Sequence, residues 1–128
     1  MIGVDTSSMI DWLKGQDTPQ TRWIDRAMDE DRLYLPPPVE TELLSFPHPQ
    51  RELPWVLSRL PRLDLTEGVW TRAGLSRRKL KALGLKAMLA DALIAQCCID
   101  AGAALITSDA DFRHFAEHCG LKLAVALK

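Results

Sequence analysis

Short apolar segments alternate with helix-like segments along the whole chain, and this alternation constrains the fold more than any other feature. Five segments read as strands: residues 1–4, 33–35, 63–65, 104–107 and 121–127. In the clearest helical segment, apolar residues recur on one face: Met88, Ala92, Ala95 and Ile99. Strands that alternate with amphipathic helices predict an α/β fold with a parallel sheet. The last strand has no polar alternation after Lys122 and is therefore expected to be buried on both faces.

The length and the cysteine content indicate one domain in a reducing compartment. A chain of 128 residues fits a single domain, which we expect to cover residues 1–128 and to bury a core without disulfides. The three cysteines are Cys97, Cys98 and Cys119. Because two of them are adjacent and the number is odd, a disulfide framework is not expected.

Neither a secretion signal nor a membrane span is expected. Asp5 lies where a signal peptide would have its apolar run. The longest apolar stretch, residues 88–99, is interrupted by Asp91 and Gln96 and is too short to cross a bilayer. We therefore expect a cytoplasmic protein that does not associate with membranes.

Positive charge is concentrated in one region although the net charge is only −1. No acidic residue lies between Glu67 and Asp91, a stretch that contains several cations: Arg72, Arg77, Arg78, Lys79, Lys81 and Lys86. A local basic surface can bind polyanions even when the total charge is near zero. A solvated helix face is the alternative interpretation of the same residues.

Acidic residues follow two of the expected strands directly. Asp5 comes after the first strand, and Asp109 and Asp111 come after the strand that ends at Thr107. Ligands of open parallel sheets bind beyond the carboxyl ends of the strands, so these carboxylates are expected to converge there. Crowded carboxylates repel each other, and a bound cation would relieve that repulsion. The neighbouring hydroxyl groups can orient the carboxylates: Thr6, Ser7 and Thr107.

Two further acids lie inside apolar helical segments. Asp91 is the only charged residue of residues 88–95, and Glu42 precedes two leucines. Glu40 lies close to Glu42, and the two leucines favour Glu42 as the inward-facing glutamate. A buried charge needs a partner, and sites made only of oxygen ligands suit Mg²⁺ or Mn²⁺. A single aspartate at a strand end is more often a helix cap, but four acids in this arrangement favour a metal site.

Four motifs together resemble the PIN domain, and most closely the VapC-type toxin ribonucleases of VapBC toxin–antitoxin pairs. In chain order, the motifs are VDTS at the first strand, ETELL, LADALIAQCC and ALITSDADF. The resemblance covers nearly the whole chain in the expected order. It implies a three-layer fold in which helices flank a mainly parallel sheet of four to five strands.

The resemblance also implies an activity and a set of site residues. Four acids fall on the catalytic and metal-binding positions of the family: Asp5, Glu42, Asp91 and Asp109. Asp111 falls on a fifth position that is often acidic, and Thr6 or Ser7, together with Thr107, fall on accompanying hydroxyl positions. The implied activity is hydrolysis of RNA by metal-activated water. The basic residues would then contact RNA phosphates: Arg77, Arg78, Lys79, Lys81 and the outlying Arg113.

As a toxin, the protein would form a homodimer and bind an antitoxin whose tail lies along the acidic pocket and inserts an arginine.

A PIN-like module that binds RNA or protein without cutting is the main alternative. An aspartyl phosphatase is disfavoured because Ser7 occupies the place of its second acid, and a receiver domain because no lysine follows the strand 104–107. His114 and His118 have metal-ligand spacing but are expected at the surface. The four tryptophans are expected to be core or partner-facing residues rather than base-stacking platforms.

Overall fold

A three-stranded parallel sheet lies at the centre of the computed structural model, which describes residues 1–127. The strands are β1 (Ile2–Val4), β2 (Leu33–Tyr34) and β3 (Ala104–Ile106), in the order β2-β1-β3. Ile2 is paired with Leu33 on one side and with Ala104 on the other. The first strand is therefore the central one, and Asp5 leaves the sheet from its middle.

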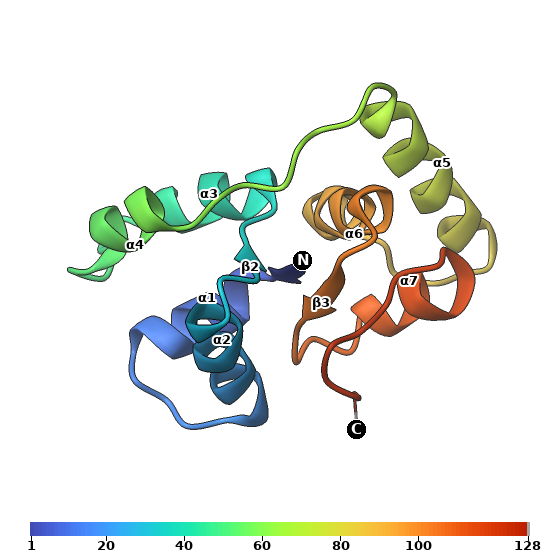
Figure 1. Ribbon diagram of the computed structural model, residues 1–128. Coiled ribbons are helices and arrows are strands. Elements are labelled where there is room, and N and C mark those ends of the chain that lie inside the picture. Colours follow the sequence, from blue (N-terminus) through green and yellow to red (C-terminus); the bar gives the residue numbers. More distant parts are fainter. Residues whose placement is uncertain (128) are drawn as a thin grey trace.

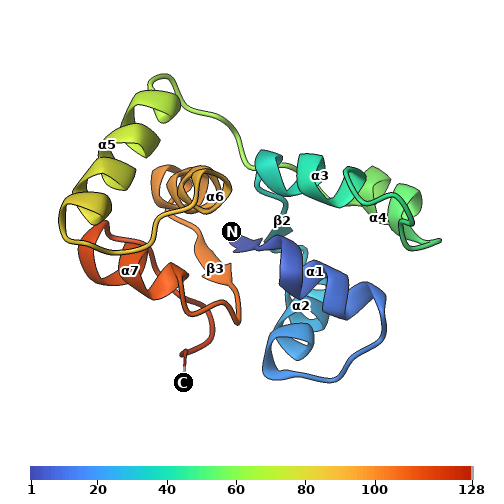
Figure 2. The ribbon, with the colours of Figure 1, turned by 180° about the vertical axis from the view of Figure 1, so that it is seen from behind.

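Seven helices of the described chain surround this sheet: α1 (Thr6–Leu13), α2 (Pro19–Asp29), α3 (Pro37–Leu44), α4 (Leu53–Arg59), α5 (Val69–Ala82), α6 (Leu89–Ala101) and α7 (Phe112–His118). Figure 1 shows α1 and α2 on one side of the sheet and α6 on the other, with α5 and α7 outside α6. The same layers are visible from behind in Figure 2, where α3 and α4 extend away from α5. The expected α/β fold with a parallel sheet flanked by helices is confirmed. Within residues 1–127, no helix combines the length and the apolar character that a membrane span needs.

The expectation of four to five strands was wrong, because the two outer segments form only single bridges. Leu35 pairs with Arg62 at one edge, and Leu105 pairs with Leu123 at the other. Pro36 and Pro61 lie beside the first bridge and have no N–H group to extend a ladder. At the other edge, the next outward carbonyl of β3, that of Thr107, accepts a hydrogen bond from the Gln20 amide at 3.2 Å. Residues 123–125 are half-buried, so burial of the last segment on both faces was also wrong.

Local sequence signals fix the start of the helices that frame the carboxyl edge of the sheet. The Asp5 carboxylate caps α1 by accepting from the Ser8 N–H at 3.0 Å. Thr18 and Thr21 form a capping box at the start of α2. Two prolines occupy the first turn of α3, where a missing N–H is tolerated. The caps therefore orient several helix N-termini toward the same edge.

Gly3 lets α6 pack closely against the central strand. A Cβ atom at position 3 would lie 2.7 Å from the Sγ atom of Cys98, a fully buried residue of α6. The neighbours of Gly3 in β1, Ile2 and Val4, are themselves buried and belong to the same hydrophobic core. Position 3 therefore sets the distance between the sheet and the helix that carries Asp91.

Gly3→Ala is expected to reduce the free energy of unfolding by about 1–3 kcal/mol, because the added methyl group overpacks the contact with Cys98. Combining it with Cys98→Ala should cost less than the sum of the two single changes, which urea denaturation would measure. Gly74→Ala is the matched control, since nothing lies within 4 Å of its Cβ position in α5. An equal response of Gly3→Ala and Gly74→Ala would show that the contact is not tight.

Candidate metal centre

The acids that the sequence singles out converge on one pocket at the carboxyl edge of the sheet. This cavity, of about 220 Å³, lies where β1 ends and α1 and α6 begin. Four carboxylates line it: Asp5, Glu42, Asp91 and Asp109. Thr6 and Ser7 also line it, and Ile10, Phe46, Ile94 and Phe112 supply apolar walls. Four residues far apart in sequence are thus brought together by the fold.

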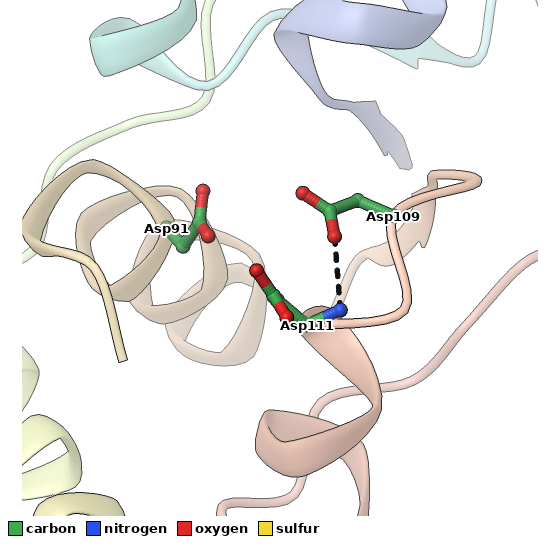
Figure 3. Close-up of side chains that lie close together, drawn as sticks. All are labelled: Asp91, Asp109 and Asp111. Carbon is green, nitrogen blue, oxygen red and sulfur yellow. Dashed lines mark hydrogen bonds between the residues drawn. The ribbon is translucent and has the colours of Figure 1, made fainter. Parts of the chain in front are cut away.

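Three of the carboxylates approach each other closely enough to share one cation. Asp91, Asp109 and Asp111 each offer one oxygen atom, and these atoms all lie within 4.8 Å of one another. Figure 3 shows Asp91 on α6 facing the two aspartates of the loop before α7. The Asp111 N–H donates to the Asp109 carboxylate at 2.9 Å, which fixes the turn between them. Asp91 and Asp109 belong both to the four carboxylates that line the pocket and to this cluster of three, so the five acids form one patch.

Asp5 is held by a network that joins the ends of β1 and β3. The Thr107 hydroxyl donates to the Asp5 carboxylate at 2.5 Å and accepts from the Asp109 N–H at 3.0 Å. The Ser7 hydroxyl donates to the same carboxylate at 3.1 Å. Asp5 and Thr107 are both buried, and their contacts are therefore shielded from water. The predicted supporting hydroxyl groups thus contact a predicted acid directly.

The two glutamates of α3 have different partners. The Thr6 hydroxyl donates to the Glu42 carboxylate at 2.6 Å, and Glu42 lines the acidic pocket. Glu40 instead forms an ion pair with Arg62. Of the two glutamates, Glu42 therefore lies with the other acids of the pocket, and Glu40 lies outside it.

Burial raises the pKa values of two carboxyl groups in the pocket. Burial, together with repulsion by Asp109, Asp111, Glu42 and Asp5, raises the pKa of Asp91 to about 6. Burial also raises the pKa of Asp5, although hydrogen bonds from Thr107 and Ser8 oppose the shift. Without a cation, the folded protein therefore binds protons at these positions more tightly than the unfolded chain does.

Lys86 supplies positive charge to this patch from the loop before α6. Its Nζ atom lies 3.1 Å from an Asp111 carboxylate oxygen, and the ion pair raises the pKa of the Lys86 ammonium. In the sequence, Lys86 belongs to the basic stretch between Glu67 and Asp91 and is not assigned to the acidic site. The sequence signal for its position is Gly84, two residues earlier, which has a φ of 74° in the loop before α6.

The residues of this patch fit a hard divalent cation. Every side-chain donor is a carboxylate or hydroxyl oxygen, which is the ligand type that Mg²⁺ and Mn²⁺ prefer. The Lys86 ammonium, 3.1 Å from Asp111, already places positive charge beside the cluster. His114 and His118 are not part of the acidic group found among residues 1–127.

The predicted RNA-binding residues do not form one continuous surface. Arg77, Arg78 and Lys81 line a groove between α5 and α6. Lys79 lies elsewhere and donates to the His118 carbonyl at 2.6 Å. Arg113, near the start of α7, is half-buried and does not line this groove. Arg72 is held in an ion pair with Asp100 at 2.7 Å.

The fold and the site define a class, namely an α/β protein with a carboxylate-lined pocket beyond the carboxyl edge of a parallel sheet. The sequence matches the model of the PIN domain over residues 2–118, so the chain belongs to the PIN domain family. Proteins of this family are nucleases that generally use divalent metals. None of the curated proteins matches the sequence significantly.

Solved structures share this fold at low sequence identity. The structure of VapBC2 from Rickettsia felis bound to a DNA fragment from their promoter contains a similar chain, with a TM-score of 0.73 and 23% identity over 96% of this chain and 97% of that one. FitAcB from Neisseria gonorrhoeae gives a TM-score of 0.67 at 21% identity, with 96% of both chains covered. FitAB bound to an IR36 DNA fragment gives 0.69 at 21% identity, covering 96% of this chain and 93% of that one.

Asp91→Asn is expected to stabilise the metal-free protein near pH 7.5. The pKa of Asp91 is about 6 in the folded state and about 4 in an unfolded chain. Its charge therefore opposes folding above pH 6, and this penalty disappears as the pH falls from about 6 to 4. Urea midpoints measured in chelator should consequently differ between wild type and variant at pH 7.5 and converge near pH 4.

Asp64→Asn is the control for this measurement, because Asp64 is exposed and has no ion pair with any of residues 1–127. Its effect should be small at every pH. A wild-type protein that is more stable than Asp91→Asn at pH 7.5 would contradict the repulsion described above.

Proposed function

We propose that this protein is a divalent-metal-dependent endoribonuclease that hydrolyses RNA phosphodiester bonds. The observation that carries the proposal is the convergence of Asp5, Glu42, Asp91 and Asp109 on one pocket in a chain of the PIN domain family. Asp111 extends the same acidic patch. A helix cap alone would explain one acid at a strand end, but not two more that reach the same pocket from α3 and α6.

Each group of residues has a distinct part in this proposal. Asp91, Asp109 and Asp111 would hold the cation, because their oxygens lie within 4.8 Å of one another. Asp5 and Glu42 would complete the site from the other end of the patch, oriented by Thr107, Ser7 and Thr6. When bound, Mg²⁺ or Mn²⁺ would lower the pKa of water and stabilise charge on the phosphate. No side-chain nucleophile is then needed.

The basic residues are proposed to bind the RNA backbone. Arg78 and Lys81 are exposed beside the groove between α5 and α6, and Arg77 lies with them. Lys79 and Arg113 lie outside this groove and would contribute only from neighbouring surfaces. Lys86 is an additional cation at the acidic site itself and would be released from Asp111 when a metal ion neutralises that carboxylate.

Asp91→Asn and Glu42→Gln are expected to lower kcat/KM for RNA cleavage by about a hundredfold or more, since each removes charge that holds the metal. The protein would be purified without a partner, stripped with chelator, and assayed on structured and single-stranded RNAs with Mg²⁺ or Mn²⁺ restored or withheld. Glu40→Gln is the matched control on the same helix, because Glu40 pairs with Arg62 and should be dispensable.

Two results would contradict the proposal. Cleavage that persists in chelator, or in both acidic-site variants, would show that the metal centre is not responsible. Binding of RNA with no cleavage in either metal would instead support a catalytically silent module. A calorimetric titration with Mn²⁺ separates these cases, because a real site binds metal even when the RNA substrate is wrong.

We further propose that the protein is the toxin of a type II toxin–antitoxin pair in the cytoplasm. The similar chains lie in VapBC2 and FitAB assemblies, which supports an antitoxin as partner. An extended antitoxin tail with an arginine would meet the carboxylates of the acidic pocket favourably. All three cysteines are free, in keeping with a reducing compartment. A homodimer is part of the same proposal.

Expression of the chain without a partner is expected to slow bacterial growth, because unrestrained cleavage depletes RNA. Asp91→Asn should relieve the effect, and so should co-expression of the product of a neighbouring small reading frame. Colony counts after induction would measure both. If growth is unaffected and no such product binds, the toxin role fails while the nuclease activity is judged separately by the cleavage assay.

A further inference from the structure

Trp70 is an exposed aromatic residue at the start of α5, so of the two roles expected for the tryptophans, core or partner-facing, it does not have the core one. Its exposed fraction is 59%, whereas Val69, Ala73 and Leu80 are buried against the rest of the protein. The exposed Leu89 lines the same groove, so Trp70 belongs to an apolar patch and is not a singly exposed residue. The position of Trp70 therefore needs an explanation beyond packing.

The groove that Trp70 lines is basic. It has a volume of about 640 Å³, and its cationic residues are Arg77, Arg78 and Lys81. Among residues 1–127, no carboxylate lines it. Arg78 and Lys81 form no ion pair with any of residues 1–127, so their charges are available to a ligand. Charge complementarity therefore favours a polyanion over a basic or neutral protein segment. Among polyanions, the indole beside these cations favours a nucleic acid, whose bases can stack on it.

A second hollow lies between this groove and the acidic pocket and shares lining residues with both. This hollow, of about 340 Å³, lies between α6 and the start of α3, and it shares Trp70, Leu89 and Leu93 with the basic groove. Glu42 lines this second hollow and also the acidic pocket. Figure 2 shows α5, α6 and α3 in this order across the molecule. Trp70 thus lies between the cations and the carboxylates.

We propose that Trp70 is a base-stacking platform for unpaired RNA that runs from the groove along α5 to the metal centre. This inference rests on the proposed ribonuclease function. Arg78 and Lys81 pair with phosphates of the bound strand, and a base beside the cleavage site stacks on the indole of Trp70. Unpaired bases offer a free face for stacking, whereas the bases of a duplex are already stacked on each other. The residue therefore selects single-stranded segments and loops.

Binding of a short fluorescein-labelled oligoadenylate, measured by anisotropy in chelator, tests the platform without cleavage. Trp70→Ala is expected to weaken binding by about tenfold, and Trp70→Phe should recover part of the loss. Trp55→Ala is the matched control, because Trp55 is 57% exposed and also has an arginine, Arg59, over its ring, but it lies on α4. A duplex of the same sequence should bind more weakly and respond less to Trp70→Ala.

The salt dependence of binding separates stacking from charge. Arg78→Gln and Lys81→Gln should each reduce the slope of log affinity against log salt by about 0.7. Trp70→Ala should lower the affinity and leave this slope unchanged, because stacking releases no counterions. A Trp70→Ala variant that changes only the slope would contradict a stacking role.

Three outcomes would overturn the inference. If Trp70→Ala binds and cleaves RNA with the affinity and kcat/KM of the wild type, the stacking role is rejected and the nuclease proposal is unaffected. Absence of both RNA binding and RNA cleavage in the wild type would reject the platform and the nuclease together. Dissociation of a dimer by Trp70→Ala in sedimentation, with RNA affinity unchanged, would identify the surface as an interface between two copies of the chain.

Discussion

Mutual repulsion of carboxylates at one edge of a small parallel sheet is the constraint on which the rest of this structure depends. Asp5 follows β1, Glu42 lies on α3, Asp91 lies on α6, and Asp109 and Asp111 lie in the loop before α7. Thr107 joins the ends of β1 and β3 through Asp5 and the Asp109 backbone, and Thr6 restrains Glu42. The fold therefore spends part of its stability on holding like charges together, which is typical of a site that acquires a cation.

The acids and the layer order could be predicted from the sequence, because both follow from local patterns. Strand-end aspartates, helix periodicity and an isolated charge among apolar residues are visible without knowledge of tertiary contacts. The number of strands was not predictable in this way. Residues 63–65 and 121–127 have strand-like composition, yet within residues 1–127 the only bridge at the first segment is at Arg62, just before it, and the described part of the second forms one bridge, at Leu123. Their pairing depends on Pro61 and on Gln20, whose amide takes the Thr107 carbonyl from another element.

The remaining parts of the site depend on loops, whose direction the sequence does not specify. Lys86 reaches Asp111 only because the turn at Gly84 brings the start of α6 back beside α7. The basic residues of α5 looked like one stripe in the sequence, but the helix distributes them, so that Lys79 faces α7 while Arg78 and Lys81 line the groove. Trp70 belongs to this groove by its place on the helix surface, since its sequence neighbours Val69 and Ala73 are buried.

The double use of Asp5 has a consequence for how such a protein can change over evolutionary time. Its carboxylate is both a member of the acidic patch and the cap of α1, with the Ser8 N–H as partner. Loss of the charge is tolerable only if the cap survives, and Asn and Ser retain capping whereas Ala does not. In a descendant that no longer needs the acid but keeps the fold, only a few residues that can cap α1 would therefore be tolerated at position 5. In such a descendant, Asn or Ser at position 5 would indicate that the fold was retained after the acidic site was lost.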